Sequence, residues 1–305
     1  MPAKADSAVV DCLVIGGGPA GLTAAIYLAR FRRAVLIVHD AASRAELIPK
    51  THNYPGFCDG ISGRDLLAAL REQAQRYGAA LRQATVTGLA KSDDGLRAAI
   101  GDEAVSARTV ILACGIVDEK PSLPGLSELI ESGRIRFCPV CDAYEAGGKR
   151  IAVIGPARHA FAKALFLRTY TSTVTLLTFE GSAALDPDQR RAVEEAGIVA
   201  PSDPIAQLTA EDNSFTAVTA GGTRLELDVV YAVMGARARS ELAIGLGAQC
   251  NEDGLLIVDA KQRTSVEHLY AVGDLTVDLH QLSVATGQAA VAACDVHNSL
   301  PDNYV

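Results

Sequence analysis

The sequence predicts an α/β protein made of two similar domains, because one strand–turn–helix pattern occurs twice. Residues 9–29 contain an apolar strand, a glycine turn and a small-residue helix, and residues 150–169 repeat this order. In each half a later apolar strand also ends on a glycine, which is Gly115 in the first half and Gly235 in the second. Such units pack as parallel sheets covered by helices. We therefore expect two Rossmann-like (three-layer ββα) nucleotide-binding domains.

The first of these domains is predicted to be discontinuous. Residues 255–297 hold further apolar strands and a long small-residue helix, and these have no counterpart in the second half. Pro121, Pro124 and Gly125 punctuate a change in composition where the chain is expected to cross between domains. We predict a first domain of residues 1–118 and 238–305, with residues 119–237 inserted as the second.

Composition and charge exclude several classes of function. The chain is 49% apolar and 21% charged, which is typical of a soluble globular protein. No apolar run approaches the roughly 18 residues of a membrane helix, and the first residues lack the apolar core of a signal peptide. We therefore expect no membrane association and a cytoplasmic location. The net charge of −8 argues against nucleic acid as a partner.

A glycine-rich turn near the N-terminus predicts a dinucleotide site. Gly16-x-Gly18-x-x-Gly21 follows a strand and opens a helix, which is the context that this motif requires. Its glycines allow a tight turn, approach to a pyrophosphate and close helix packing, and the helix N-terminus favours an anion. Asp40 follows Gly21 at the spacing of a ribose ligand. A purely structural glycine turn is the alternative.

Cys138 and Cys141 are the two of seven cysteines that require a chemical explanation. The five single cysteines are expected to be small buried hydrophobic residues, because a reducing compartment disfavours structural disulfides. Two thiols three positions apart can close a redox-active disulfide, and the adjacent Asp142 can shuttle the proton that exchange requires. A zinc site would need a second pair or nearby histidines, so we predict no metal. Chance spacing is the remaining alternative.

A third motif, 271–274, follows an apolar run and precedes the long C-terminal helix. Asp274 in this position can bind the ribityl hydroxyls of a flavin, and the helix N-terminus beyond it can face the isoalloxazine carbonyl. The alternative is a strand-ending turn in which the aspartate is a cap.

Taken together, these residues resemble the low-molecular-weight thioredoxin reductase family over nearly the whole chain. The resemblance implies a homodimer with one FAD per subunit and an inserted domain that binds NADPH. It also implies that the inserted domain rotates to carry the cysteine pair between the flavin and a partner protein. The matching segments are residues 16–21, 53–57, 111–115, 138–142, 264–274, 281 and 285–287.

The same resemblance assigns roles to individual residues. Cys141 is expected to face the flavin, Cys138 to attack the substrate disulfide, and Asp142 to act as the acid/base. The expected FAD contacts are Gly16, Gly18, Pro19, Ala20, Gly21, Asp40, Asn53, Gly115, Asp274 and Gln281.

The second glycine turn departs from the family pattern. The family has Gly-x-Gly-x-x-Ala/Gly here, whereas residues 155–160 contain Pro156 and Ala157. Pro156 removes a backbone donor, and Ala157 adds a methyl group where the backbone must approach closely. After the next strand the family carries a basic run for the 2′-phosphate, whereas this chain has Glu180. We therefore predict a branch with a degraded NADPH site, in which NADPH does not bind in the usual way.

The departures leave the electron partner open. Family precedents are ferredoxin, a second flavin, and oxygen, the last in enzymes that oxidise a small dithiol. The substrate is expected to be a thioredoxin-like protein or a small dithiol or disulfide, and a non-enzymatic redox sensor is the alternative. The basic run 30–33 either docks an acidic donor such as ferredoxin or is a solvated helix end.

Two further residues depart from the family near the expected flavin. His280 stands where thioredoxin reductases commonly have arginine, and it is predicted to tune the flavin or shuttle a proton. An ordinary helix-entry residue is the alternative. Cys58 follows the segment 53–57 and is either a third redox thiol or a bystander.

Overall fold

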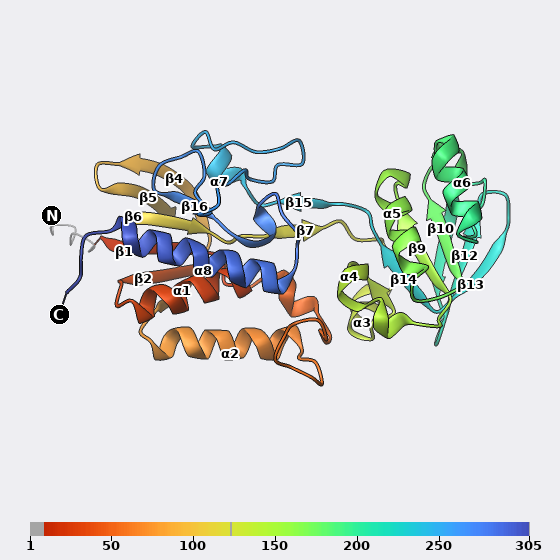
Figure 1. Cartoon of the computed structure of the whole chain (residues 1–305), viewed down its shortest axis with the longest axis horizontal. Coiled ribbons are helices and arrows are strands. Elements are labelled where there is room, and N and C mark those ends of the chain that lie inside the picture. The colour runs from red at the N-terminus through yellow and green to blue at the C-terminus, as the bar shows by residue number, and fades with distance from the viewer. Residues whose placement is uncertain (1–8, 123, 305) are drawn as a thin grey trace.

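The computed structural model describes residues 9–122 and 124–304, which form two domains joined by two extended segments (Figure 1). The first domain contains the strands β1 (Val10–Ile15), β2 (Val35–His39), β3 (Ala80–Gln83), β4 (Val86–Ser92), β5 (Gly95–Ile100), β6 (Glu103–Leu112) and β16 (Leu269–Ala271). These strands form one sheet in the order β3-β2-β1-β6-β5-β4, and β16 pairs with β6 beyond the point where β5 leaves it. The pairs among β1, β2, β3, β6 and β16 are parallel, whereas β4 and β5 add an antiparallel layer.

Helices cover one face of this sheet (Figure 1). They and the short helices of the domain are α1 (Pro19–Arg30), η1 (Arg44–Leu47), α2 (Gly63–Arg76), α7 (Glu241–Ile244), η4 (Gly273–Leu275) and α8 (Leu282–Ser299). The alternation of β1 explains the layering, because Cys12 and Val14 pack with α1 and α8 while Leu13 and Ile15 pack with β5 and β16. Both faces of β1 are therefore buried, as expected for a central parallel strand.

The second domain has its own parallel sheet in the order β10-β9-β14-β8. Its strands are β8 (Ile135–Arg136), β9 (Ile151–Gly155), β10 (Val174–Thr178) and β14 (Val229–Ala232). A three-stranded antiparallel layer consists of β11 (Ile205–Ala210), β12 (Phe215–Thr219) and β13 (Arg224–Leu227). The helices are α3 (Leu126–Glu131), α4 (Pro139–Asp142), η2 (Tyr144–Ala146), α5 (Ala157–Leu167), η3 (Ser182–Ala184) and α6 (Pro187–Glu195).

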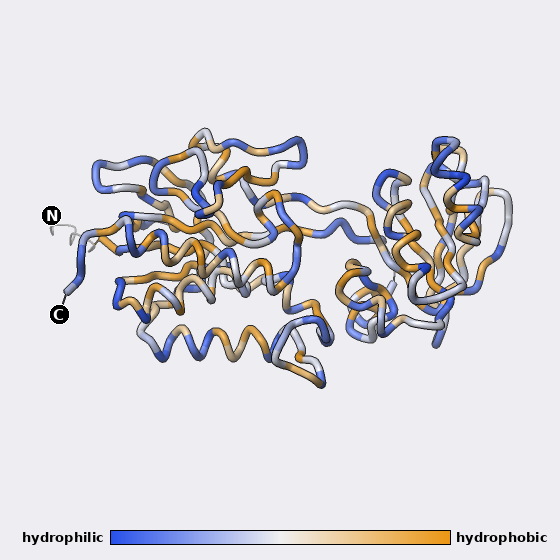
Figure 2. The backbone as a smooth tube through the Cα atoms, viewed as in Figure 1, coloured by the Kyte–Doolittle hydropathy of each residue, from blue (hydrophilic) through white to orange (hydrophobic). Residues whose placement is uncertain are grey.

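The chain crosses between the domains through β7 (Ile116–Asp118) and β15 (Ala236–Ala238), which pair antiparallel. Hydrophobic residues gather along the central strands of both domains, and the outer loops are hydrophilic (Figure 2). The predicted fold class, two Rossmann-like α/β domains, is confirmed. Among the described residues no helix is both long enough and apolar enough to span a membrane.

Arg33 anchors the C-terminal segment to the end of α1. The residue is 7% exposed, and its guanidinium donates to His297 Nδ1 at 3.0 Å, to the His297 carbonyl at 3.1 Å and to the Pro301 carbonyl at 2.7 Å. Arg30 lies over the ring of Tyr77, 4.8 Å from its centroid. The basic run 30–33 therefore does not form one exposed docking surface.

Replacement of Arg33 tests this anchor. Arg33→Met should lower the free energy of unfolding by about 2 kcal/mol, because the buried hydrogen bonds to the last turn of α8 and to Pro301 are lost. Urea unfolding followed by circular dichroism measures the change. Arg32→Met is the matched control, since it removes the same charge from an exposed side chain. Equal stability of the two variants would contradict the anchor.

Candidate active site

The glycine turn after β1 is fixed by two close backbone approaches. A Cβ added to Gly16, whose φ is +120°, would lie 2.3 Å from the Ala113 carbonyl oxygen at the end of β6. A Cβ on Gly21 would lie 2.0 Å from the Gly16 carbonyl oxygen, so α1 can pack this closely on the turn only with glycine there. Gly18 differs, because a Cβ there would meet only Ser43 Oγ, at 3.4 Å. Its missing side chain therefore leaves space on the open side of the turn.

The N-terminus of α1 is available to an anion. Gly18 is the N-cap residue, Pro19 opens the helix, and the first turn has neither a capping side chain nor an acidic residue. Free N–H groups and the helix dipole at such an end favour a phosphate group. The predicted dinucleotide turn thus has the backbone geometry and the electrostatic character that a pyrophosphate requires.

A cleft of about 1190 Å³ extends from this turn to the second domain. Its size exceeds that of ordinary small-ligand pockets, which matches a molecule as long as FAD. Of the predicted site residues, only Gly21 does not line the cleft, because it packs beneath the turn. The residues that line it are Gly16, Gly18, Pro19, Ala20, Asp40, Asn53, Gly115, Cys138, Cys141, Asp142, Asp274, His280 and Gln281.

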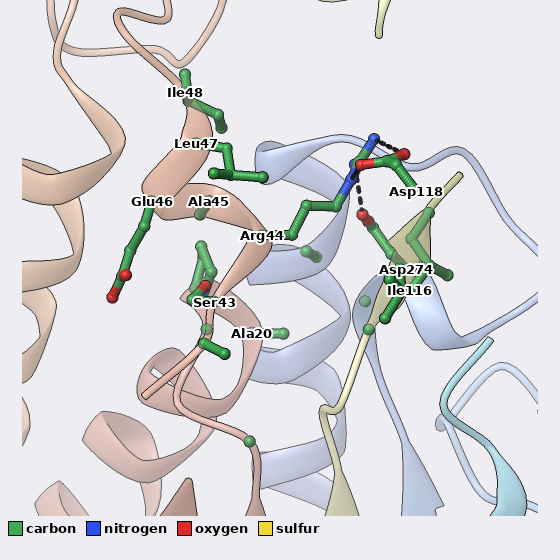
Figure 3. Close-up of a pocket in the computed structure, with 18 of the residues that line it drawn as sticks. Ala20, Ser43, Arg44, Ala45, Glu46, Leu47, Ile48, Ile116, Asp118 and Asp274 are labelled. Atoms are coloured by element: carbon green, nitrogen blue, oxygen red, sulfur yellow. Dashed lines mark hydrogen bonds and ion pairs between the residues drawn. The ribbon is translucent and has the colours of Figure 1, made fainter. Parts of the chain in front are cut away.

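Arg44 joins two carboxylates on the wall of the cleft (Figure 3). Its Nε and one terminal nitrogen bind Asp118 at 2.6 and 2.9 Å, and the other nitrogen binds Asp274 at 3.0 Å. Asp274 lies in η4, directly after β16, as the motif predicts. Sequence reasoning did not single out Arg44 or Asp118, because the three residues come from distant segments and form no local pattern.

Asp40 lies one residue beyond β2, which ends at His39. Its Oδ2 pairs with Arg239 at 2.5 Å, and its Oδ1 accepts a hydrogen bond from the backbone N–H of Ala42 at 3.1 Å. Burial opposes ionisation of this carboxyl, but the Arg239 guanidinium outweighs it and lowers the pKa of Asp40. The carboxylate is therefore charged at neutral pH, and any ribose hydroxyl must share it with Arg239.

Cys138 and Cys141 form a disulfide at the start of the one-turn helix α4. Cys138 is the N-cap residue, and both cysteines are half-buried where the second domain faces the cleft. Gln281 Nε2 lies 3.4 Å from each sulfur. Asn53 donates to Gln281 Oε1 at 2.9 Å and approaches the Val140 carbonyl at 3.3 Å. Gln281 of the first domain thus contacts the redox pair of the second, and Asn53 contacts the backbone between the two cysteines.

Asp142 ends α4, directly after Cys141. Burial raises the pKa of its carboxyl, although Arg136 and the hydroxyl of Tyr231 favour the charged form. Tyr231 donates to Asp142 Oδ1 at 2.8 Å, and Arg136 lies 3.7 Å from the same oxygen. A carboxyl with a raised pKa beside a cysteine pair is suited to hold and release a proton.

The other predicted or suspected groups are placed less centrally. His280 lines the cleft, and its Nε2 lies 3.4 Å from the Thr276 carbonyl oxygen. Cys58 is exposed and does not belong to the lining of the cleft. Cys114 does line the cleft, but burial raises the pKa of its thiol to about 11, so it stays protonated at neutral pH.

At the second glycine turn a carboxylate accepts a hydrogen bond from the first N–H of the helix. Pro156 is the N-cap residue of α5, and the first helical N–H, on Ala157, donates to Glu180 Oε2 at 3.3 Å. Glu180 thus places a negative charge at the end of α5, where a dinucleotide phosphate would require positive potential.

Gly18 provides a test of the first turn that does not depend on folding. Gly18→Ala adds a methyl group that the protein itself accommodates, so thermal stability of the FAD-free protein should be unchanged. The methyl group would occupy the space predicted for the pyrophosphate, and FAD affinity should fall at least tenfold, by about 1.4 kcal/mol. The flavin content of the purified protein and FAD titration measure this. Gly88→Ala, where the added Cβ meets Ala99 at 3.9 Å, is the control. Equal flavin content in both variants would contradict the predicted site.

Known proteins match almost the entire chain. Residues 10–292 match the family model of pyridine nucleotide-disulphide oxidoreductases. Thioredoxin reductase of Mycolicibacterium smegmatis is 32% identical over 96% of this chain and 97% of its own. The crystal structure of HlmI is 28% identical, with a TM-score of 0.86 over 95% of this chain and 92% of its own. The atypical thioredoxin reductase TRi from Desulfovibrio vulgaris Hildenborough is 31% identical, with a TM-score of 0.54 over 95% and 97%. The chain belongs to the pyridine nucleotide-disulphide oxidoreductase family and is a flavoprotein disulfide oxidoreductase of the thioredoxin reductase type.

Proposed function

We propose that this protein is an FAD-dependent oxidoreductase that exchanges electrons between Cys138/Cys141 and an external dithiol or disulfide. The observation that carries the proposal is the position of the disulfide, which opens onto the same cleft as the turn at Gly16 and Gly18. A cofactor held by that turn and a substrate at the sulfurs would therefore share one cleft. FAD, when bound, would supply the two-electron chemistry that links the cysteine pair to its electron partner.

Different residues are proposed to bind the cofactor and to carry out thiol–disulfide exchange. The end of α1 would hold the pyrophosphate, and Asp274 the ribityl hydroxyls. In the reduced enzyme, the Cys138 thiolate attacks a substrate disulfide, forming a mixed disulfide and releasing one substrate thiol that takes a proton from Asp142. Asp142 then accepts the proton of Cys141, whose thiolate attacks the Cys138 sulfur of the mixed disulfide. The second substrate sulfur leaves as Cys138 and Cys141 close their disulfide, and it takes this proton from Asp142. The same steps in reverse oxidise a dithiol and reduce the cysteine pair.

We further propose that NADPH is not the usual electron partner. Glu180 at the end of α5 supports this, because its carboxylate competes with a phosphate for the helix N-terminus and repels it. Pro156 adds to the effect, since it removes a donor at the entrance to the helix. Ferredoxin, a second flavin and oxygen are the partners that the family resemblance leaves open. The burial of Arg33 weakens the case for a ferredoxin surface at residues 30–33.

The substrate is proposed to be a thioredoxin-like protein or a small dithiol. The similarity to thioredoxin reductases supports the first, and the half-buried disulfide inside the cleft supports the second, because a small molecule can reach it there. By the same family resemblance we propose that the chain acts as a homodimer.

Anaerobic spectra of the flavin test the proposal and separate its parts. A dithiol should remove the visible flavin absorbance, because electrons pass through the cysteine pair, whereas NADPH at the same concentration should not. Cys141→Ser should abolish the response to dithiol at unchanged flavin content, and Cys294→Ser, an exposed cysteine on α8, is the matched control. Rapid loss of absorbance with micromolar NADPH would overturn the proposal about the donor. A dithiol response that survives in Cys141→Ser would overturn the role of the pair.

A further inference from the structure

Tyr231 brings a polar atom into the core of the second domain. It lies in β14, is 0% exposed, and packs in an apolar cluster with Ile151, Val153 and Ala164. Its hydroxyl donates to Asp142 Oδ1 at 2.8 Å. A phenylalanine ring would fill the same space without a buried hydroxyl group, so packing alone does not explain the tyrosine. Buried tyrosine hydroxyls require a partner, and here the partner is the carboxylate next to the redox pair.

Opposing influences act on the carboxyl of Asp142, and burial prevails, so its pKa is raised. Burial disfavours the charged form, and the nearby Glu145 acts in the same direction. Arg136 and Tyr231 favour the charged form, the former from β8 and the latter from β14. Arg136 also donates to the Asp142 carbonyl at 2.5 Å and to the Gly133 carbonyl at 2.7 Å, which fixes the guanidinium beside the carboxyl. Tyr231 is the one neutral group among these neighbours that contacts the carboxylate directly.

We propose that Tyr231 is a positioning residue for thiol–disulfide exchange, which holds the Asp142 carboxyl in one orientation and lets it lose its proton again. This inference rests on the proposed function, in which Asp142 alternately gives a proton to the leaving substrate sulfur and takes one from Cys141. A buried carboxyl without the hydrogen bond would hold its proton too strongly to give it to a leaving sulfur. Tyr231, Arg136 and Asp142 all belong to the second domain, so their contacts with one another need no residue of the first domain.

Infrared titration of the oxidised protein measures the proton on Asp142 without any enzymatic turnover. The band of the protonated carboxyl is identified by its loss in Asp142→Asn. We call the pH at which this band has lost half of its intensity the Asp142 midpoint. In Tyr231→Phe this midpoint should rise by about one pH unit, because a hydrogen bond to a charged group is lost. Fluorotyrosine incorporated at position 231 should move the midpoint to lower pH, because its more acidic hydroxyl is a stronger donor to the carboxylate.

Tyr270 provides the matched control. It is buried in the first domain, and its hydroxyl donates to Asp295 Oδ2 at 2.9 Å, so Tyr270→Phe removes an equivalent hydrogen bond elsewhere. This control should leave the Asp142 midpoint unchanged. An unchanged midpoint in folded Tyr231→Phe, or an equal shift in Tyr270→Phe, would overturn the inference.

Exchange kinetics separate this inference from the proposed function. The substrate is a small aromatic disulfide, and Cys138 and Cys141 are reduced beforehand. The exchange rate should fall as the pH rises and Asp142 loses its proton. In Tyr231→Phe this fall should occur at higher pH, in step with the infrared midpoint. A shifted midpoint with an unshifted rate profile would refute the positioning role while leaving the exchange activity established. A wild-type protein that reduces no disulfide would instead refute the proposed function, and the infrared titration would still decide whether Tyr231 controls the proton on Asp142.

Discussion

The contact between the two domains is the constraint on which the rest of the site depends. The cleft belongs mainly to the first domain and the disulfide to the second, and the chain connects them only through β7 and β15. Among the described residues, the side-chain hydrogen bonds and ion pairs across the gap are those of Gln281 with the sulfurs, Asn53 with Val140, and an exposed Arg64–Glu131 pair at 2.9 Å. Such an exposed ion pair contributes less than about 1 kcal/mol. The two domains are therefore held in this arrangement by weak forces, and relatives of similar identity match it unequally, with TM-scores of 0.86 and 0.54.

The groups proposed for proton transfer and those proposed to hold the flavin lie in different domains. The groups that would handle protons, Asp142 with Arg136 and Tyr231, lie in the same domain as the cysteines and keep their geometry wherever that domain goes. The groups that would hold the flavin, at the turn of α1 and in η4, stay in the first domain. Gln281 contacts the disulfide, and Asn53 the Val140 carbonyl beside it, only while the domains meet. Under the proposed function, the groups for proton transfer would stay beside the cysteines in any arrangement of the domains, whereas exchange of electrons with a flavin in the first domain would need the two domains in contact.

The sequence predicts those parts of the site that are set by local steric demands. The turn at Gly16 and Gly21 is recognisable because a side chain at either position would collide with backbone, and the pair Cys138/Cys141 lies within one helical turn. The Arg44 contacts with Asp118 and Asp274 are not predictable in this way, since each partner comes from a different part of the chain. Tyr231 lies 89 residues from Asp142, and in the sequence it is simply one apolar residue of a buried strand. Long-range partners leave no periodic pattern, so only the folded chain reveals them.

The second glycine turn separates the demands of the fold from the demands of a ligand. A Cβ on Gly155 would lie 2.4 Å from the Val233 carbonyl oxygen, the same collision that Gly16 avoids with Ala113 in the first domain. Glycine is therefore present where the ends of two neighbouring parallel strands come too close for a side chain. Ala157 occupies the position where only a bound dinucleotide would require glycine, and Pro156 stands between it and Gly155. The carboxylate of Glu180 provides, at the N-terminus of α5, the negative charge that a bound phosphate would otherwise provide. The helix is therefore stabilised without a ligand. A domain with this turn can fold and carry the cysteine pair whether or not it binds a nucleotide.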